Sequence, residues 1–209
     1  MDATRKVFDQ WAQDGRAENM EKEHSKNVIK FLTTVSFEKP FTFLDVGCGN
    51  GWVVRKMIEQ NNCRRATGID KSKNMIKQAN RKKISKKENY IHVDIESWKH
   101  KGKFDFIFAM ESLYYVESVE NSLRRIFEML KPNGKFFCGT DFYSENKDTV
   151  IWSEIMKIKM HLYSRKEWRE LFKNVGFEVK TRQIKDRYGN KKWKREVGTL
   201  FIIGHKPER

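Results

Sequence analysis

The sequence predicts an α/β protein built as one domain. Short apolar runs of β-favouring residues alternate along the chain with segments whose apolar residues recur at helical spacing. Between residues 41 and 58, a strand, a glycine-rich turn and a helix follow one another, an arrangement that brings the backbone close to a nucleotide-like ligand. The length of 209 residues fits one domain with a sizeable core.

Two helices are expected ahead of the first strand, within residues 4–37. Apolar side chains at helical spacing indicate a short helix around residues 7–11, and Gly15 ends it. A longer helix follows, with an apolar stripe made of Val28, Phe31, Leu32 and Val35. Such an amphipathic pair can pack on the flank of a sheet.

The first strand, Phe41–Val46, leads into a loop with three glycines at alternate positions. The spacing is G-x-G-x-G, which differs from the G-x-G-x-x-G of dinucleotide-binding folds. A carboxylate just before the first glycine would repel a pyrophosphate, so the loop favours a ligand that carries positive charge. The residues that we expect around this ligand are Asp45, Gly47, Cys48, Gly49 and Gly51.

Two later strands also end in a carboxylate. The run Arg64–Asp70 places Asp70 23 positions after Gly47, about the interval at which nucleotide-binding α/β folds place the acid that accepts ribose hydroxyls. Ser72 caps the helix that follows, and Tyr90–Asp94 is the third strand.

The second half of the chain continues the alternation. Residues 104–110 are apolar enough for a strand buried on both faces, and residues 118–131 form an amphipathic helix. Pro132 and the Asn133-Gly134 turn end that helix before a strand over residues 135–140. Ser164-Arg-Lys-Glu is a capping box that begins a helix, and residues 177–184 and 197–205 are two strands around a basic turn.

The string Leu44-Asp-Val-Gly-Cys-Gly-Asn-Gly51 closely resembles motif I of the class I S-adenosylmethionine (SAM)-dependent methyltransferases. Phe104–Met110 resembles motif IV of that family, and Leu130-Lys-Pro-Asn-Gly-Lys-Phe-Phe137 resembles its L-K-P-G-G segment. The resemblance implies a doubly wound, seven-stranded Rossmann-like sheet in the order 3-2-1-4-5-7-6 with the last strand antiparallel. It also implies an N-terminal helical lid over residues 1–40 and a methyltransferase domain over residues 41–209.

The same resemblance implies SAM as cofactor and S-adenosylhomocysteine as product. The family's acid after strand three bonds the adenine amino group, and Asp94 and Ile95 match that position. Lys71, after the ribose acid, and Met110, at the end of the fourth strand, complete the expected cofactor contacts. Met110-Glu-Ser-Leu-Tyr-Tyr-Val116 looks like the substrate loop of small-molecule methyltransferases of the quinone-biosynthesis type.

Catalytic and lid residues are expected on both sides of that loop. Glu111 and Tyr115 are candidates for contact with the substrate or the sulfonium, and His161, in the 141–163 segment, is a candidate general base. For Tyr114, core packing is an equal alternative. The resemblance makes Trp11, Arg16, Met20 and His24 candidate lid residues; the alternative is an amphipathic helix packed on the flank of the sheet, with His24 solvated.

Several reaction classes are disfavoured. The chain lacks the Asn/Asp/Ser-Pro-Pro-Tyr/Phe motif of the subfamily that methylates the amino groups of adenine, cytosine or glutamine. It also lacks the Pro-Cys dipeptide of pyrimidine methylation by a cysteine nucleophile. Its three cysteines have no C-x-x-C pairing or histidine spacing, so no disulfide framework and no metal site are predicted. No apolar run approaches the roughly 20 residues of a membrane span, and we expect a soluble cytoplasmic protein.

The formal charge of +15 is concentrated in two segments. Lys71–Lys87 holds eight basic residues and no acid, and Val179–Arg195 holds eight and one acid. The turn Arg187–Arg195 mixes cations with aromatic residues, which can follow a phosphate backbone and stack bases, or hold one anionic group of a metabolite. Solvated surface is the alternative for any charge run.

Three functions therefore stay open. The first is a methyltransferase acting on a small molecule, which includes anionic ones. The second is a methyltransferase acting on RNA, such as tRNA, or another large anion. The third is a SAM-binding protein that has lost catalysis.

Overall fold

The computed structural model describes residues 3–208. Its elements, in chain order, are α1 (Ala3–Gln13), α2 (Arg16–Leu32), β1 (Phe41–Val46), α3 (Trp52–Ile58), β2 (Cys63–Asp70), α4 (Lys73–Arg81), β3 (Glu88–His92), β4 (Phe104–Met110), the 3-10 turn η1 (Leu113–Tyr115), α5 (Val119–Met129), β5 (Leu130–Thr140), α6 (Trp152–Met156), α7 (Arg165–Val175), β6 (Glu178–Ile184), α8 (Lys192–Glu196) and β7 (Thr199–His205). Strands and helices alternate over most of the described chain, as the sequence predicts, but β4 follows β3 with no helix between them.

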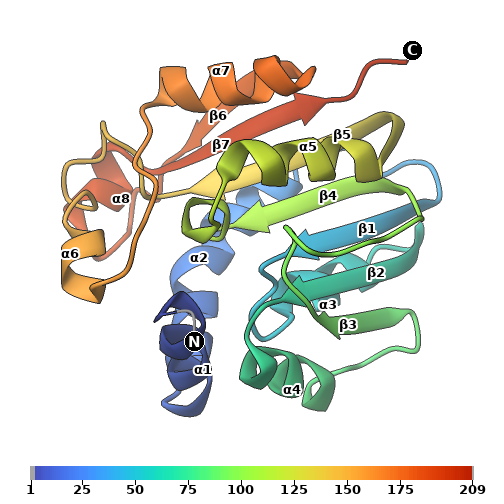
Figure 1. Ribbon diagram of the computed structural model, residues 1–209, viewed down its shortest axis with the longest axis horizontal. Coiled ribbons are helices and arrows are strands. Elements are labelled where there is room, and N and C mark those ends of the chain that lie inside the picture. The colour runs from blue at the N-terminus through green and yellow to red at the C-terminus, as the bar shows by residue number, and fades with distance from the viewer. Residues whose placement is uncertain (1–2, 209) are drawn as a thin grey trace.

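The seven strands form one sheet in the order β3-β2-β1-β4-β5-β7-β6. Strands β1 to β5 are all parallel to one another, and β7 runs antiparallel to both β5 and β6. The expected strand order and the antiparallel last strand are therefore confirmed. In Figure 1 the carboxyl ends of β1, β2 and β4 point toward α1 and α2.

The core lies on both faces of the sheet because buried residues alternate along each central strand. Leu44 of β1 and Ile107 of β4 belong to the apolar cluster that includes Trp168 of α7. Their neighbours Phe43 and Phe108 belong to the second cluster, on the opposite face. This cluster includes residues of α2, α3 and α4, so helices cover both faces and the sheet is doubly wound.

Helix α2 has two parts with different surroundings. Its second half contributes Val28, Phe31 and Leu32 to the second cluster, and the Phe31 ring stacks on Phe201 with the centroids 4.0 Å apart. Its first half and α1 form a smaller apolar cluster with Met75 of α4. The second half of α2 is thus part of the core, whereas α1 belongs to the smaller cluster and also contacts the first cluster through its partly buried Val7 and Phe8.

Three local expectations need correction. β3 ends at His92, so Asp94 lies two residues beyond the strand and not at its last position. Residues 130–134 are part of β5, where the pairing with β4 shifts register, although Asn133 has the positive φ of 61° that a tight turn needs. The basic turn after β6 contains a short helix, α8. Within residues 3–208, no helix is both long and apolar enough to cross a bilayer.

Candidate cofactor and acceptor site

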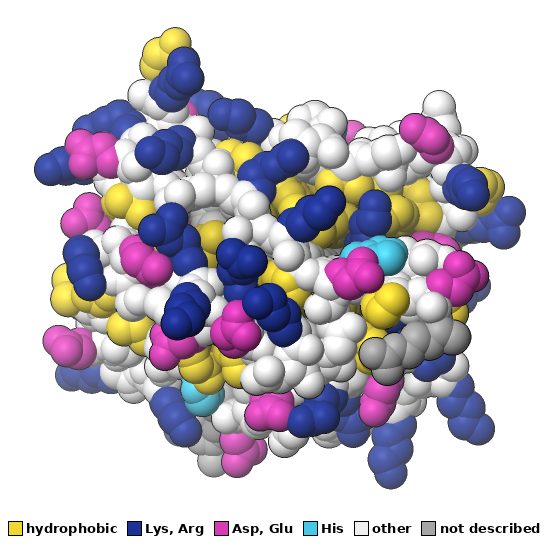
Figure 2. Space-filling model, turned by 90° about the horizontal axis from the view of Figure 1, so that it is seen from above, with side chains coloured by type: hydrophobic (Ala, Val, Ile, Leu, Met, Phe, Trp, Pro, Cys, Tyr) yellow, Lys and Arg dark blue, Asp and Glu magenta, His cyan; other side chains and the backbone are white. Residues whose placement is uncertain are grey.

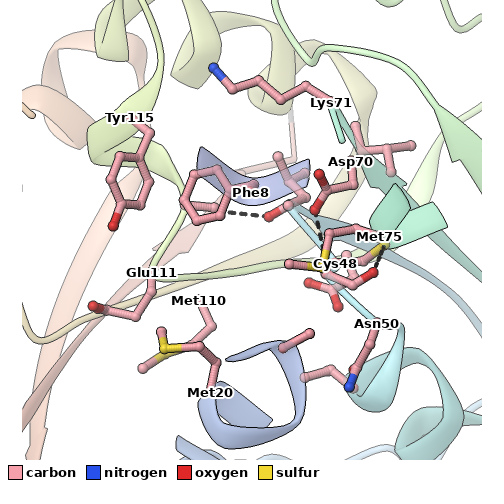
Figure 3. A pocket seen from close by; sticks show the side chains of 18 of the residues that line it. Phe8, Met20, Cys48, Asn50, Asp70, Lys71, Met75, Met110, Glu111 and Tyr115 are labelled. Carbon is pink, nitrogen blue, oxygen red and sulfur yellow. Dashed lines mark hydrogen bonds between the residues drawn. The ribbon is translucent and has the colours of Figure 1, made fainter. Parts of the chain in front are cut away.

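A pocket opens at the carboxyl ends of β1, β2 and β4, and α1 and α2 form its roof (Figure 1). Figure 3 shows that its polar groups gather at two ends. Asp70, Cys48 and Lys71 lie at one end, Glu111 and Tyr115 lie at the other, and Phe8 of α1 lies between them. We call these the acidic end and the acceptor end.

The glycine loop has backbone angles that favour glycine. Gly47, Gly49 and Gly51 have φ angles of 74°, 52° and 80°, in the left-handed region. A Cβ on Gly47 would lie 2.4 Å from Cβ of Ser112, which closes the loop against the end of β4. A Cβ on Gly49 would meet no protein atom within 4 Å. Since Gly49 lines the pocket, the empty space beside it belongs to the ligand cavity.

Asp70 holds the loop in this shape. Its Oδ2 accepts the backbone N–H of Gly49 at 2.9 Å, and its Oδ1 accepts that of Ser72 at 2.8 Å. Each carboxylate oxygen has a second lone pair, so Asp70 can still accept hydrogen bonds from a diol in the pocket. Ser72 in turn caps α4, because its Oγ accepts the Met75 N–H at 3.1 Å.

Asp45 makes the acidic end favourable for a cation. Its side chain is buried and lines the pocket. Burial and the nearby charge of Asp70 raise the pKa of Asp45 well above its usual range, because two carboxylates share a poorly solvated site. A positively charged ligand group would relieve that repulsion.

The other expected cofactor contacts also line the pocket, namely Cys48, Lys71, Asp94, Ile95 and Met110. Oδ1 of Asp94 accepts the Glu96 N–H at 2.9 Å, which fixes the loop after β3. The Cys48 thiol is buried, and burial raises its pKa well above the usual range, so it is a packing group and not a reactive thiolate.

The acceptor end is built around Glu111, the residue after β4. Its φ of 52° is unusual for a residue with a side chain and directs the carboxylate into the protein interior. The Tyr114 hydroxyl donates to Glu111 Oε2 at 2.7 Å, and the Asp141 N–H donates to Oε1. Burial, with the charge of Asp141, raises the pKa of Glu111 to about 7.

Tyr115 completes this end on the side of α1. It lines the pocket and packs edge-to-face on Phe8 with the ring centroids 4.9 Å apart. Its hydroxyl lies 3.8 Å from the sulfur of Met156. Tyr114 does not line the pocket, so the packing alternative holds for its ring while its hydroxyl supports Glu111.

The expected lid residues divide into two groups. Trp11, Met20 and His24 line the pocket. Arg16 does not: its guanidinium lies over the Trp11 ring at 5.7 Å and pairs with Asp14 at 3.4 Å. Arg16 therefore supports Trp11 from the solvent side.

Helix α1 is tied to α4 by polar contacts. Asp9 Oδ1 accepts hydrogen bonds from the Ser72 hydroxyl at 2.6 Å and the Asn74 N–H at 3.2 Å. The side-chain amide of Gln78 donates to Ala12 O. These bonds join the lid helix to the cap that follows Asp70.

His161 lies outside the pocket. Its Nε2 is 3.0 Å from Val116 O, and its backbone N–H donates to Tyr114 O at 2.9 Å. The ring stacks parallel to Tyr163 at 6.0 Å. In this structure His161 connects the segment before α7 to the loop after β4, and it is not among the residues that face the cavity.

Sequence reasoning missed several residues of the site. Phe8, Asn50 and Ser112 line the pocket, and Asp141 stands behind Glu111. Asp141 directly follows β5, much as Asp70 ends β2. Ligand-binding residues gather at the carboxyl ends of parallel strands, so this rule could have indicated Asp141 from the sequence. Phe8 had only helical spacing to indicate it, which core packing explains equally well.

Comparison with known protein families gives a match over most of the chain. Residues 16–181 match a family model described as a methyltransferase domain. Three curated relatives are a malonyl-[acyl-carrier protein] O-methyltransferase of Priestia megaterium, a ubiquinone biosynthesis O-methyltransferase of Pelagibacter ubique and a tRNA U34 carboxymethyltransferase of Pseudoalteromonas atlantica. They are 24%, 33% and 30% identical over 65%, 55% and 52% of this chain. Those matches cover 47%, 49% and 34% of the relatives, so the chain spans about half of their length or less.

Solved structures match the whole length. A methyltransferase solved in complex with the Haloferax volcanii Trm112 methyltransferase activator is 28% identical, with a TM-score of 0.89 and coverage of 96% of this chain and 98% of that one. The 1,6-didemethyltoxoflavin-N1-methyltransferase of Burkholderia thailandensis, solved with S-adenosylhomocysteine, has 17% identity and a TM-score of 0.73, covering 99% of this chain and 88% of that one. The second likeness shows the fold alone.

Proposed function

This chain belongs to the methyltransferase-domain family, and from that premise we propose that it transfers a methyl group from SAM to a small-molecule acceptor beneath α1 and α2. The observation that carries the proposal is the division of one pocket into an acidic end and an acceptor end. One ligand can occupy each end, with the reacting atoms between them.

The residues of the acidic end fit SAM. The space beside Gly49 holds no protein atom within 4 Å of where a Cβ would be, so a ligand could occupy it. Asp70 keeps lone pairs that could accept hydrogen bonds from the ribose hydroxyls. Asp45 offers a buried carboxylate to the positively charged amino-acid end, and we propose that Asp94 and Ile95, which line the pocket, contact the adenine. Bound SAM would supply an electrophilic methyl group on its sulfonium.

The chain's own contribution would be alignment and exclusion of water. Phe8 and Trp11 cover the pocket from α1, and Met20 covers it from α2. Holding two reactants in line within such an enclosed space can contribute up to roughly 7–11 kcal/mol to lowering a barrier. Glu111 and Tyr115 are the polar side chains at the acceptor end, and we propose that they contact and orient the acceptor.

Calorimetry with S-adenosylhomocysteine tests the cofactor half of the proposal, with one-to-one binding as the expected result. Labelled SAM incubated with a panel of small hydroxy, carboxy and amino compounds tests the acceptor half. Transfer to a panel member that is lost in Tyr115→Ala but retained in Tyr188→Ala would support the assignment. Tyr188 is 90% exposed and does not line the pocket, so it is a matched aromatic control. Cofactor binding with no transfer to any compound would instead favour the non-catalytic alternative.

An RNA acceptor is the second candidate, and exposed Tyr188 beside the Lys26 ammonium is the observation that favours it. Other features of the basic turn weigh against it. Lys191 and Lys194 both pair with Glu23 of α2, and Trp193 is buried against Trp152. On the face in Figure 2, basic side chains are spread out with acidic ones between many of them. A near-zero salt dependence of tRNA binding would remove this candidate.

We further propose that the chain works with a small activator protein of the Trm112 type. Support comes from the Haloferax volcanii complex, whose methyltransferase matches this chain from end to end. Co-expression with such an activator should give a stable one-to-one complex on gel filtration. Two separate peaks at micromolar concentrations would count against the partnership.

A further inference from the structure

Three ionisable side chains meet behind the acceptor end. They are His24 in the middle of α2, Glu111 after β4 and Asp141 after β5, and we call them the His24 cluster. All three are buried, and one ligand-type atom from each lies within 4.8 Å of the others. An imidazole and two carboxylates at this separation could all reach one central ion.

The cluster holds polar atoms that the surrounding protein does not satisfy. His24 Nδ1 lies 3.3 Å from Asp141 Oδ2, an ion-pair distance, but neither ring nitrogen has a hydrogen-bond partner among the described residues. Asp141 Oδ1 also has no hydrogen-bond partner within residues 3–208. The side chains of His24 and Asp141 are only 8% and 1% exposed, so water from the bulk does not compensate. Buried polar atoms left open in this way point to a missing partner.

Hydrogen bonds to the backbone fix the chain at two of the three residues, Asp141 and Glu111. The Asp141 carbonyl accepts hydrogen bonds from the Asn146 amide at 2.8 Å and the Thr149 hydroxyl at 2.9 Å. The Glu111 N–H donates to Gly139 O at 3.0 Å, which fixes the left-handed turn that directs its carboxylate inward. These bonds position the two residues that carry the carboxylates, whereas the His24 ring and Asp141 Oδ1 have no hydrogen-bond partner among the described residues.

Glu111 retains capacity to bind an ion. Each of its oxygens accepts one hydrogen bond, from Tyr114 or from the Asp141 backbone, and each has a second lone pair. His24 and Glu111 also line the pocket, so an ion can reach the cluster from the ligand cavity.

We propose that the His24 cluster binds one divalent transition-metal ion of the Mn²⁺ to Zn²⁺ series. One imidazole and two carboxylates form a mixed nitrogen and oxygen donor set of the kind such ions accept. Because His24 and Glu111 also line the pocket, a bound acceptor could approach such an ion, and three protein ligands would leave it open coordination positions. An acceptor oxygen or nitrogen could fill one of them, where the ion would stabilise its anionic form. The proposal that the cluster binds an ion does not depend on the proposed function. The role of that ion toward a methyl acceptor does depend on it.

A purely structural role is the competing explanation. The His24–Asp141 pair could simply join α2 to the sheet, since breaking a buried pair is costly even where the pair adds little net stability. That role requires no metal affinity, so a binding experiment separates the two.

The experiment uses the full chain after treatment with a chelator. Co²⁺ is added while its visible absorption is recorded, and Zn²⁺ binding is measured by calorimetry. We expect saturable one-to-one binding and cobalt bands of an ordered low-symmetry site. His24→Gln, Glu111→Gln and Asp141→Asn should each weaken binding by about 100-fold or more, since even supporting residues of metal sites contribute roughly 10–100-fold.

The control is His205→Ala. His205 and Glu178 form a histidine–carboxylate pair at 3.0 Å on the surface, with side chains 32% and 70% exposed, so adventitious binding would arise there as readily. Binding in this variant should equal that of the wild type. Calorimetry with S-adenosylhomocysteine on the same samples reports separately on the cofactor site and on folding of each variant.

Wild-type protein that shows no saturable binding of Co²⁺ or Zn²⁺ would overturn the proposal, whatever the variants do. Binding that survives in folded His24→Gln, or that disappears in His205→Ala, would overturn it as well. In the wild type, Co²⁺ should also broaden the ring signals of one buried histidine in NMR spectra. This measurement decides the matter if the cluster variants do not fold.

Discussion

Replacing Asp70 by Asn is the sharpest test of the acidic end, because the change keeps the size of the side chain and removes one acceptor. Asp70 accepts the Gly49 N–H through one oxygen and the Ser72 N–H through the other, at 2.9 Å and 2.8 Å. Asparagine has a single oxygen, so its amide nitrogen must face one of these two donors. An unsatisfied buried donor costs about 1–3 kcal/mol, which should appear as lower stability.

The larger effect is expected on cofactor binding. The ribose hydroxyls would lose a charged acceptor, and hydrogen bonds to charged groups contribute about 1.5–3 kcal/mol. At about 1.4 kcal/mol per factor of ten, the Kd for S-adenosylhomocysteine should rise by roughly 10–150-fold. Calorimetry measures this change directly, and urea unfolding measures the loss of stability.

Asp105→Asn is the matched control. Asp105 lies near the start of β4, at the end of the strand away from the pocket. Its carboxylate accepts hydrogen bonds from the Thr42 N–H at 2.7 Å and from the Lys131 ammonium at 2.9 Å. Its replacement should lower stability to a comparable degree while the Kd stays unchanged. If Asp70→Asn binds S-adenosylhomocysteine within about threefold of the wild type, a range that corresponds to less than about 0.7 kcal/mol, the reasoning about Asp70 is wrong.

Three further predictions concern the loop, the core and acid stability. Gly49 and Gly15 both have a positive φ, and a Cβ added at either would meet no protein atom within 4 Å. Gly49→Ala and Gly15→Ala should each lower the free energy of unfolding by about 1–2 kcal/mol. Only Gly49→Ala should weaken S-adenosylhomocysteine binding in calorimetry. Equal affinities would mean that the space beside Gly49 is not the cofactor cavity. Phe31→Ala should lower the free energy of unfolding by about 3–5 kcal/mol in urea, whereas Tyr188→Ala should change it by less than about 0.5 kcal/mol. Burial alone would raise the pKa of Asp105, but hydrogen bonds from Lys131 and Thr42 hold this pKa below its usual range in the folded protein. The ionised carboxylate therefore contributes its full stabilisation above about pH 4, and this stabilisation is lost as the pH falls through the lower pKa of the folded state. Unfolding of Asp105→Asn should therefore depend less on pH between about 4 and 2 than that of the wild type, and parallel curves would contradict this.

The fold and the acidic end of the pocket could be predicted because they depend on local signals. Strand, glycine turn and helix are adjacent in the sequence, and Asp70 lies at the end of its strand. The parallel arrangement then brings the carboxyl ends together without any further information. The resemblance to known methyltransferases supplied the strand order, including the antiparallel last strand.

The acceptor end could be predicted only in part because it depends on contacts between distant segments. Glu111 and Asp141 are 30 positions apart, and His24 comes from a helix whose rotation is set by its packing on the sheet. The resemblance to known methyltransferases indicated Trp11, Arg16, Met20 and His24 together as lid residues, although Arg16 does not line the pocket. No local sequence pattern shows which of these side chains point into the pocket and which point to solvent.

The basic turn illustrates the same limit for charge. Lysines in a run normally indicate a solvated surface. Lys194 is nevertheless buried, because Glu23 of α2, 171 positions earlier, accepts its ammonium. A charge pair between the two ends of the chain cannot be inferred from the composition of either segment.

Helix α2 also determines how this protein can be modified. A rod of 17 residues, about 25 Å long, carries pocket residues at one end and core residues such as Phe31 at the other. Cutting the chain at residue 40 to exchange lids would therefore remove part of the core. Residues 3–15 end at Gly15 and meet the rest of the protein mainly through α4 and α2. This short segment is where new acceptor preferences could arise, by evolution or by design, at the least cost to folding.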